Sequence, residues 1–128
     1  MLFRSKIFLT FTIYLIITTL SACSSFNPGY SSLNGSFEAQ IDKKLADVYA
    51  ATKEVIAYKD YTITLDRKDD TSAEISGQTK RNKTSFNISL SAETSDSSYI
   101  KIKYGLLGNR DRSVAFLDQL RDTLGADE

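Results

Sequence analysis

The residue with the most distinctive chemistry is the single cysteine, Cys23, which follows two small residues, Ser21 and Ala22. A thiolate can act as a nucleophile or a metal ligand. The chain contains no histidine, so the usual general base near neutral pH and the commonest metal ligand are both missing. With one cysteine, no disulfide can form within the chain. These absences weaken a metal-binding or base-assisted catalytic role for Cys23, and the sequence around it indicates another one.

Other catalytic arrangements find little support. The chain is rich in serine, but without histidine no Ser-His-Asp triad is possible, and no serine lies in a recognisable nucleophile turn. There is no glycine-rich phosphate loop and no Cys/His cluster. A Ser-Lys pair remains conceivable. We expect no enzymatic activity and no cofactor.

The first 22 residues have the organisation of an export signal. Arg4 and Lys6 form a cationic start, and the 14 residues Ile7–Leu20 are apolar or threonine and uncharged. Spanning a bilayer takes roughly 17–25 residues, so a transmembrane anchor is the weaker alternative. The pattern predicts cleavage between Ala22 and Cys23.

The segment Leu20-Ser-Ala-Cys23 resembles the lipobox of bacterial lipoproteins. The resemblance implies that the sulfur of Cys23 carries diacylglycerol and that its amine commonly carries a third acyl chain, such as palmitate. Two or more chains give a stable membrane anchor, at about 0.8 kcal/mol per buried methylene. Ser24 stands where aspartate would resemble an inner-membrane retention signal. We therefore expect a lipoprotein of the outer membrane, facing the periplasm.

Charge and composition limit the partners of the mature chain. The full chain has 16 basic and 16 acidic residues, and removal of residues 1–22 takes Arg4 and Lys6, leaving 14 against 16. Without a basic excess, nucleic-acid binding is not expected. Residues 24–36 are rich in Ser, Asn and Gly, which predicts a flexible tether after Cys23. Residues 37–128 then form a single domain.

Hydrophobic periodicity predicts an α+β domain. Residues 37–41 alternate as a strand, and Asp42 is placed to cap an amphipathic helix through Tyr58. Four alternating strands separated by polar turns follow, the first with Tyr61, Ile63 and Leu65 on one face. A helix capped by Asn109 or Asp111 then runs to Leu124. Phe116 lies at the edge of its apolar stripe, which is formed by Val114, Leu117, Leu120 and Leu124. We expect a one-sided antiparallel sheet with both helices on the same face, an arrangement that includes helix-grip folds. The partner of the first strand is left open.

Four features resemble a family of small bacterial lipoproteins classed as a domain of unknown function. They are the lipobox, the glycine and strand at 35–41, the Ala50-Ala51 pair in the first helix, and the stretch 100–109 that enters the last helix. That stretch contains Gly105-Leu-Leu-Gly-Asn109, which is similar to a family turn of glycine, two apolar residues, glycine and aspartate. Asn109 takes the place of the aspartate. The resemblance implies localisation and fold and carries no activity.

Three further clusters have a structural and a functional interpretation. Asp66, Asp69, Asp70 and Glu74 resemble a cation site in composition, but we expect a solvated turn. Lys80, Arg81 and Lys83 can attract anionic headgroups, although a charged turn that prevents aggregation is the preferred interpretation. Between Gly105 and Gly108 we expect a tight turn with at least one leucine in the core, rather than a site of close approach for a ligand.

Two functions remain open. The first is a non-enzymatic interaction module for another envelope protein or a wall component. The alternative is the binding or carriage of a hydrophobic ligand between sheet and helices, in a cavity lined by Tyr49, Tyr61, Phe86, Tyr104 and Phe116. These rings also suit a filled core, which we favour.

Overall fold

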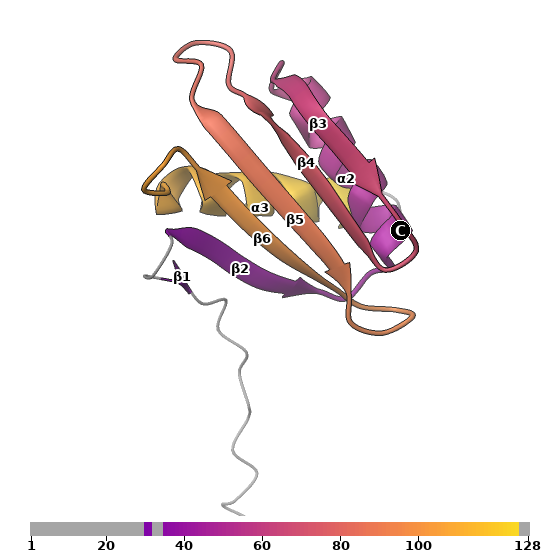
Figure 1. Cartoon of the computed structure of the whole chain (residues 1–128). Helices are drawn as coiled ribbons and strands as arrows, with labels where there is room; N and C mark the ends of the chain where they lie inside the picture. The colour runs from indigo at the N-terminus through magenta and orange to yellow at the C-terminus, as the bar shows by residue number, and fades with distance from the viewer. Residues whose placement is uncertain (1–29, 32–34, 126–128) are drawn as a thin grey trace, which may run out of the picture.

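The computed structural model describes residues 30–31 and 35–125, which form a two-layer α+β domain (Figure 1). Its elements are β1 (Tyr30–Ser31), β2 (Ser36–Ile41), α2 (Leu45–Tyr58), β3 (Thr62–Lys68), β4 (Ser72–Gln78), β5 (Ser85–Ala92), β6 (Ser98–Tyr104) and α3 (Arg110–Gly125). Apart from the two-residue β1, the predicted order of strand, helix, four strands and helix is confirmed. The predicted signal, its cleavage site at Ala22 and Cys23 lie outside the described residues.

All neighbouring strands are antiparallel, in the order β1-β2-β6-β5-β4-β3, and the sheet is open. Strands β3 to β6 form a meander. β2 lies beside β6, with Phe37 opposite Ile102 and Ile41 opposite Ser98. β2, the first of the predicted strands, thus pairs with the last strand, β6. Helix α2 then carries the chain across to the opposite edge of the sheet, where β3 begins.

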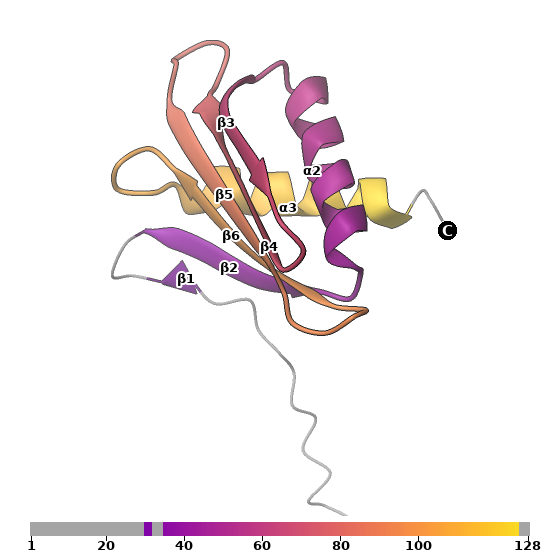
Figure 2. The same cartoon turned by 45° about the vertical axis from the view of Figure 1, so that its right-hand side comes forward.

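The core lies between one face of the sheet and the two helices (Figure 2). Alternate side chains of β2, β4, β5 and β6 are buried, and the alternation predicted for these strands is confirmed. Both helices cover the same face, as predicted, and they contact each other. Each large apolar side chain buried here contributes about 1.5–3 kcal/mol. The strand residues of this core are Phe37, Ala39, Ile41, Ala73, Ile75, Phe86, Ile88, Leu90, Ile100, Ile102 and Tyr104.

The first helix begins later than predicted. Its N-cap is Lys44, which makes no side-chain capping bond, so the prediction of Asp42 as the cap is wrong. The chain uses residues 42–44 to pass from the sheet to the helix layer, and the hydroxyl of Ser98 donates to the carbonyl of Lys43 at 2.8 Å.

The last helix begins as predicted, and Leu117, Leu120 and Leu124 are buried as expected, but the rest of its buried stripe is shifted. The backbone amide of Arg112 donates to Oδ1 of Asn109 at 3.1 Å, which confirms Asn109 as the cap. Phe116, expected at the edge of the apolar stripe, is fully buried, whereas Val114 is only half-buried. The stripe is rotated because Ser113 also faces the core, where its hydroxyl donates to the carbonyl of Asn109 at 2.9 Å.

Strand β3 departs most from the sequence prediction. Ile63 and Leu65 were expected to share a buried face, but a bulge between them changes the register. Leu65 then lies opposite the outward-facing Ser76, and Asp66 lies opposite the buried Ile75. The prediction of a one-sided apolar strand is therefore wrong. β3 is an edge strand, and its bulge and inward charge are devices that discourage pairing with another sheet.

The connection from β6 to α3 also differs from its prediction. Both Leu106 and Leu107 are exposed, by 90% and 85%, so the expectation that one of them enters the core is wrong. The glycines allow two backbone segments of the protein to lie close together. A Cβ atom added to Gly108 would collide with the carbonyl group of Gly35, and a Cβ atom added to Gly35 would collide with the carbonyl group of Leu107. The two backbones pack directly against each other, which leaves the leucines outside.

Part of the segment predicted to be a tether belongs to the sheet, since Tyr30 pairs with Phe37 and Ser31 with Ser36. Neither α2 nor α3 is long and apolar enough to span a membrane.

Candidate binding face

The outer face of the sheet has no helix over it and carries a row of polar side chains. Successive strands place five residues opposite one another, which we call the central row: Arg67 of β3, Glu74 of β4, Ser89 of β5, Lys101 of β6 and Glu38 of β2. Each alternates along its strand with residues that point the other way. The row therefore crosses the five main strands with basic and acidic groups on both sides of a serine.

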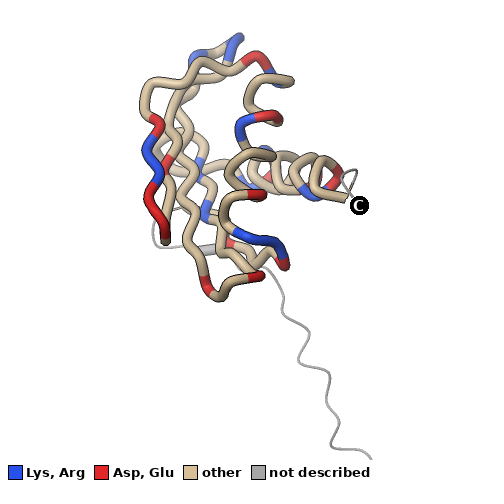
Figure 3. Tube along the Cα trace, turned by 90° about the vertical axis from the view of Figure 1, so that its right-hand side faces the viewer, with Lys and Arg blue, Asp and Glu red and all other residues tan. Residues whose placement is uncertain are grey.

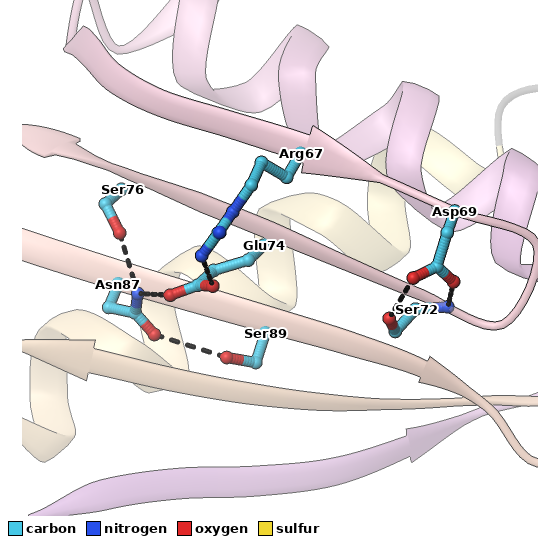
Figure 4. A network of polar contacts seen from close by, with 7 residues as sticks. All are labelled: Arg67, Asp69, Ser72, Glu74, Ser76, Asn87 and Ser89. Carbon is cyan, nitrogen blue, oxygen red and sulfur yellow. Dashed lines mark hydrogen bonds and ion pairs between the residues drawn. The ribbon is translucent and has the colours of Figure 1, made fainter.

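The half of this face on β3, β4 and β5 is held by hydrogen bonds (Figure 4). Asn87 donates from Nδ2 to Oε1 of Glu74 at 3.0 Å and to Oγ of Ser76 at 2.7 Å. Arg67 donates to Oε2 of Glu74 at 2.9 Å, and the hydroxyl of Ser89 donates to Oδ1 of Asn87 at 3.2 Å. The bonds from Asn87 and then Arg67 hold the pKa of Glu74 below its usual range. This carboxylate is therefore charged and oriented at neutral pH.

The half on β2 and β6 is built around Glu38. The Tyr99 hydroxyl donates to Oε2 of Glu38 at 2.6 Å, and Nζ of Lys101 lies 3.7 Å from Oε1. Burial, together with the bond to Glu38, raises the pKa of Tyr99 to about 12. Tyr99 thus remains a neutral donor over the physiological range, and Glu38 holds both neighbours in place.

A hollow of about 790 Å³ adjoins the central row at its β3 side, and Arg67, Glu74 and Ser89 are among its lining residues. At the neighbouring β3–β4 turn, Oδ1 of Asp69 accepts hydrogen bonds from the backbone amides of Thr71 and Ser72, each at 2.9 Å. Figure 4 shows the contacts between Asp69 and Ser72. These bonds lower the pKa of Asp69. Asp69 therefore organises the turn by bonding its own backbone.

The acidic group singled out in the sequence is divided between two faces. Asp66 lies on the helix side, where Tyr49 donates to it at 2.5 Å and Nζ of Lys53 lies 2.8 Å away. Lys53, followed by Tyr49, lowers the pKa of Asp66. Glu74 lies on the outer face. Among the described residues there is no group of three or more potential ligands that could hold a metal ion.

The five aromatic residues considered for a ligand cavity are also divided. Tyr61, Phe86 and Tyr104 contact one another, with ring centroids 5.3 to 6.3 Å apart. Phe116 is fully buried in the core. Tyr49 is half-buried at the β3 edge, beside Asp66. Burial raises the pKa of Tyr104, whose hydroxyl donates to that of Tyr61 at 3.4 Å. Three of the five rings thus pack as one cluster.

Neighbouring side chains hold both carboxylates of the outer face. Glu74 accepts hydrogen bonds from Asn87 and Arg67. Glu38 accepts one from Tyr99 and forms an ion pair with Lys101. Sequence reasoning had not singled out Glu38, Lys101 or Arg67. The signal that marks them is polar alternation in each strand, and only the strand register shows that they form one row.

The fold and this face define a class of protein: a small two-layer α+β domain with one polar, uncovered sheet face. A family model described as "Protein of unknown function (DUF3568)" matches residues 6–123. The chain therefore belongs to this family of unknown function. No curated protein matches the sequence.

Proposed function

We propose that this protein is a bacterial envelope lipoprotein, anchored by acyl chains on Cys23, whose domain binds another envelope protein or a wall component through the outer face of its sheet. The proposal is non-enzymatic. It places the protein at the outer membrane, facing the periplasm, on the basis of Ser24 following the modified cysteine.

The observation that carries the binding proposal is the central row. Its charged side chains are held by neighbours on the same face, for example Glu74 by Asn87 and Arg67. Side chains that are already ordered lose less conformational entropy when a partner binds. The alternation of basic and acidic groups favours a partner with complementary charges.

The anchor proposal is supported by the sequence before the domain. Leu20-Ser-Ala-Cys23 follows an uncharged apolar stretch, and six residues separate Cys23 from Tyr30, where β1 begins. Seven extended residue steps span about 25 Å at most. An acylated Cys23 would therefore hold the domain close to the bilayer.

The alternative of a hydrophobic-ligand carrier has less support. Ile88, Ile100 and Ile102, from the middle of the sheet, are all fully buried beneath the helices. Tyr61, Phe86 and Tyr104 contact each other. A carrier would have to bind lipid between these groups, and native mass spectrometry of protein extracted from its own membrane would reveal a retained ligand.

Cys23→Ser tests the anchor. Oxygen cannot replace sulfur in the thioether, so the variant should remain an uncleaved precursor that still carries Met1–Ala22. The intact mass of the detergent-extracted wild-type protein should instead show loss of residues 1–22 and addition of acyl groups. A wild-type mass without acyl groups would show that the anchor proposal is wrong.

Photo-cross-linking in intact cells tests the face. A photoreactive amino acid at Ser89, in the middle of the central row, should capture an envelope component. The same group at Asp118, an exposed residue of α3, serves as the matched control. Charge reversal by Lys101→Glu should abolish capture at Ser89. Equal capture from both positions, or none from Ser89, would contradict the proposal.

A further inference from the structure

Basic and acidic residues are unevenly divided between the connections at the two ends of the sheet. Figure 3 shows where the charged residues lie along the chain. One end, which we call the basic end, comprises the α2–β3 turn (residues 59–61), the β4–β5 turn (79–84) and the β6–α3 connection with the first turn of α3 (105–112). The opposite end comprises the connections at 42–44, 69–71 and 93–97, with five acidic and two basic residues. The basic end has six basic and two acidic residues: Lys59, Lys80, Arg81, Lys83, Arg110 and Arg112 against Asp60 and Asp111.

The exposed apolar side chains gather at the same basic end. Among the described residues, four large hydrophobic side chains are exposed: Tyr58, Ile63, Leu106 and Leu107. Tyr58 ends α2 and Ile63 lies near the start of β3, while the two leucines form the tip of the β6–α3 connection. These two leucines, which we call the leucine tip, are the most exposed of the four. The backbone packing of Gly108 against Gly35 leaves their side chains outside the core.

A hollow suited to an anionic group lies beside the basic turn. It has a volume of about 520 Å³, and its lining includes the basic residues Lys59, Lys80, Arg81 and Arg112. Lys80 is paired with Asp60 at 2.6 Å, so the excess positive charge comes from the other three. Phosphate groups bind well to such converging basic side chains.

Strand β1 lies at this end of the sheet. β1 begins at Tyr30, which pairs with Phe37 near the start of β2, and Gly35 contacts the β6–α3 connection. Cys23 lies within about 25 Å of extended chain from Tyr30. An anchor of this length keeps β1 close to the membrane and is short enough for the leucine tip and the basic turn to reach it.

We infer that the basic end is a second membrane contact: Leu106 and Leu107 insert into the bilayer interface, and the surrounding basic residues bind anionic headgroups. This inference rests on the proposed anchoring at Cys23 and adds an orientation to it. With the basic end on the bilayer, the outer face of the sheet stands at its side and remains open to a partner. The leucine tip matches the acyl-chain boundary of the bilayer, and the basic residues around it match the layer of anionic headgroups.

Fluorescence quenching in vesicles tests this orientation. The chain has no tryptophan, so Leu107→Trp provides a single reporter at the tip. Ser95→Trp, in the exposed β5–β6 turn at the acidic end, is the control. The full-length proteins are purified in detergent and reconstituted into phosphatidylcholine vesicles with or without phosphatidylglycerol, some of the lipid being brominated on its acyl chains.

We expect brominated lipid to quench the fluorescence of the Leu107→Trp variant by about two-fold or more and to leave that of the Ser95→Trp variant unchanged. Leu106→Ser, added to the Leu107→Trp variant, should reduce the quenching. Quenching should also be stronger with phosphatidylglycerol and weaker at high salt, because ions screen charges in water.

The outcomes separate the two proposals. Failure of the protein to float with vesicles overturns both the anchor and the tip contact. Flotation without quenching of the Leu107→Trp variant overturns the tip contact alone. A blue-shifted emission from that variant that brominated lipid does not quench would mean that a second copy of the protein covers the tip, which also overturns the tip contact. Equal quenching of both variants would overturn the inferred orientation.

Discussion

Substitution of Gly108 by alanine would test the backbone packing that positions the leucine tip. Gly108 has a φ of +78°, which disfavours any side chain, and an added Cβ would lie well under 3.0 Å from the carbonyl oxygen of Gly35. The first effect costs about 1–2 kcal/mol. The second forces a backbone shift, which costs about 1–3 kcal/mol. Gly108→Ala should therefore lose about 2–5 kcal/mol of the free energy of unfolding.

Two other glycines provide matched controls. Gly105 has a φ of +70°, but an added Cβ meets only Cγ2 of Thr84 at 3.6 Å, an ordinary contact. Gly105→Ala should cost the conformational term alone, about 1–2 kcal/mol. Gly125, the last residue of α3, has no atom within 4 Å of an added Cβ and no positive φ. Gly125→Ala should be neutral or stabilise the domain by up to about 1 kcal/mol.

Urea and thermal unfolding of residues 24–128, followed by circular dichroism, would measure the series. In a domain of this size about 1 kcal/mol moves Tm by ~4–8 °C. We therefore expect Gly108→Ala to lower Tm by about 10 °C or more, and Gly105→Ala to lower it by clearly less. Equal losses for Gly108→Ala and Gly105→Ala would refute the inferred contact between the two loops, because strain alone would then explain both.

Three further substitutions test the cap, the outer face and the edge strand. Asn109→Ala should cost about 1 kcal/mol in urea unfolding because α3 loses its cap, whereas Asn109→Asp should retain most of the stability; equal losses would contradict the capping role. The raised pKa of Tyr99, about 12, stabilises the fold below the ordinary value near 10, so stability should fall as pH rises from about 10 to 12. Tyr99→Phe should remove this component from the alkaline unfolding profile, and an unchanged profile would argue against it. Asp66→Val should cause self-association through β3, measured by light scattering after size exclusion, while Asp70→Val in the adjacent turn should remain as monomeric as the wild type; a monomeric Asp66→Val would contradict the edge-protection argument.

The central strands and both helices could be predicted because their environment is simple. Residues such as Ile75, Ile88 and Ile102 lie under the helices, and their neighbours along each strand face outward, so the alternation in the sequence matches the burial. Asn109 was one of two predicted caps, beside Asp111, because a cap bonds its own helix within a few residues. The same reasoning failed for Asp42, because the connection before α2 extends to Lys44.

The central row and the position of β2 depend on contacts between distant parts of the chain. Glu38 and Lys101 are neighbours only because β2 pairs with β6. Neither segment by itself predicts that pairing, because any alternating strand offers the same backbone hydrogen-bonding groups. The same holds for Gly35 and Gly108, whose contact joins two connections far apart in sequence. Both segments were noticed separately, but their juxtaposition required the fold.

The two regions where apolar residues failed to enter the core have different physical explanations. In β3 the bulge turns Leu65 outward and Asp66 inward, which gives the edge strand a charge that discourages pairing with a second sheet. At the β6–α3 connection, Gly35, Gly108 and the backbone of Leu107 make the loop contact, and the side chains of Leu106 and Leu107 add nothing to the core. Polar residues would satisfy that turn equally well. The exposure of two adjacent leucines is therefore not a requirement of the fold, and it is consistent with selection for contact outside the domain, the role that insertion into a bilayer interface would give them.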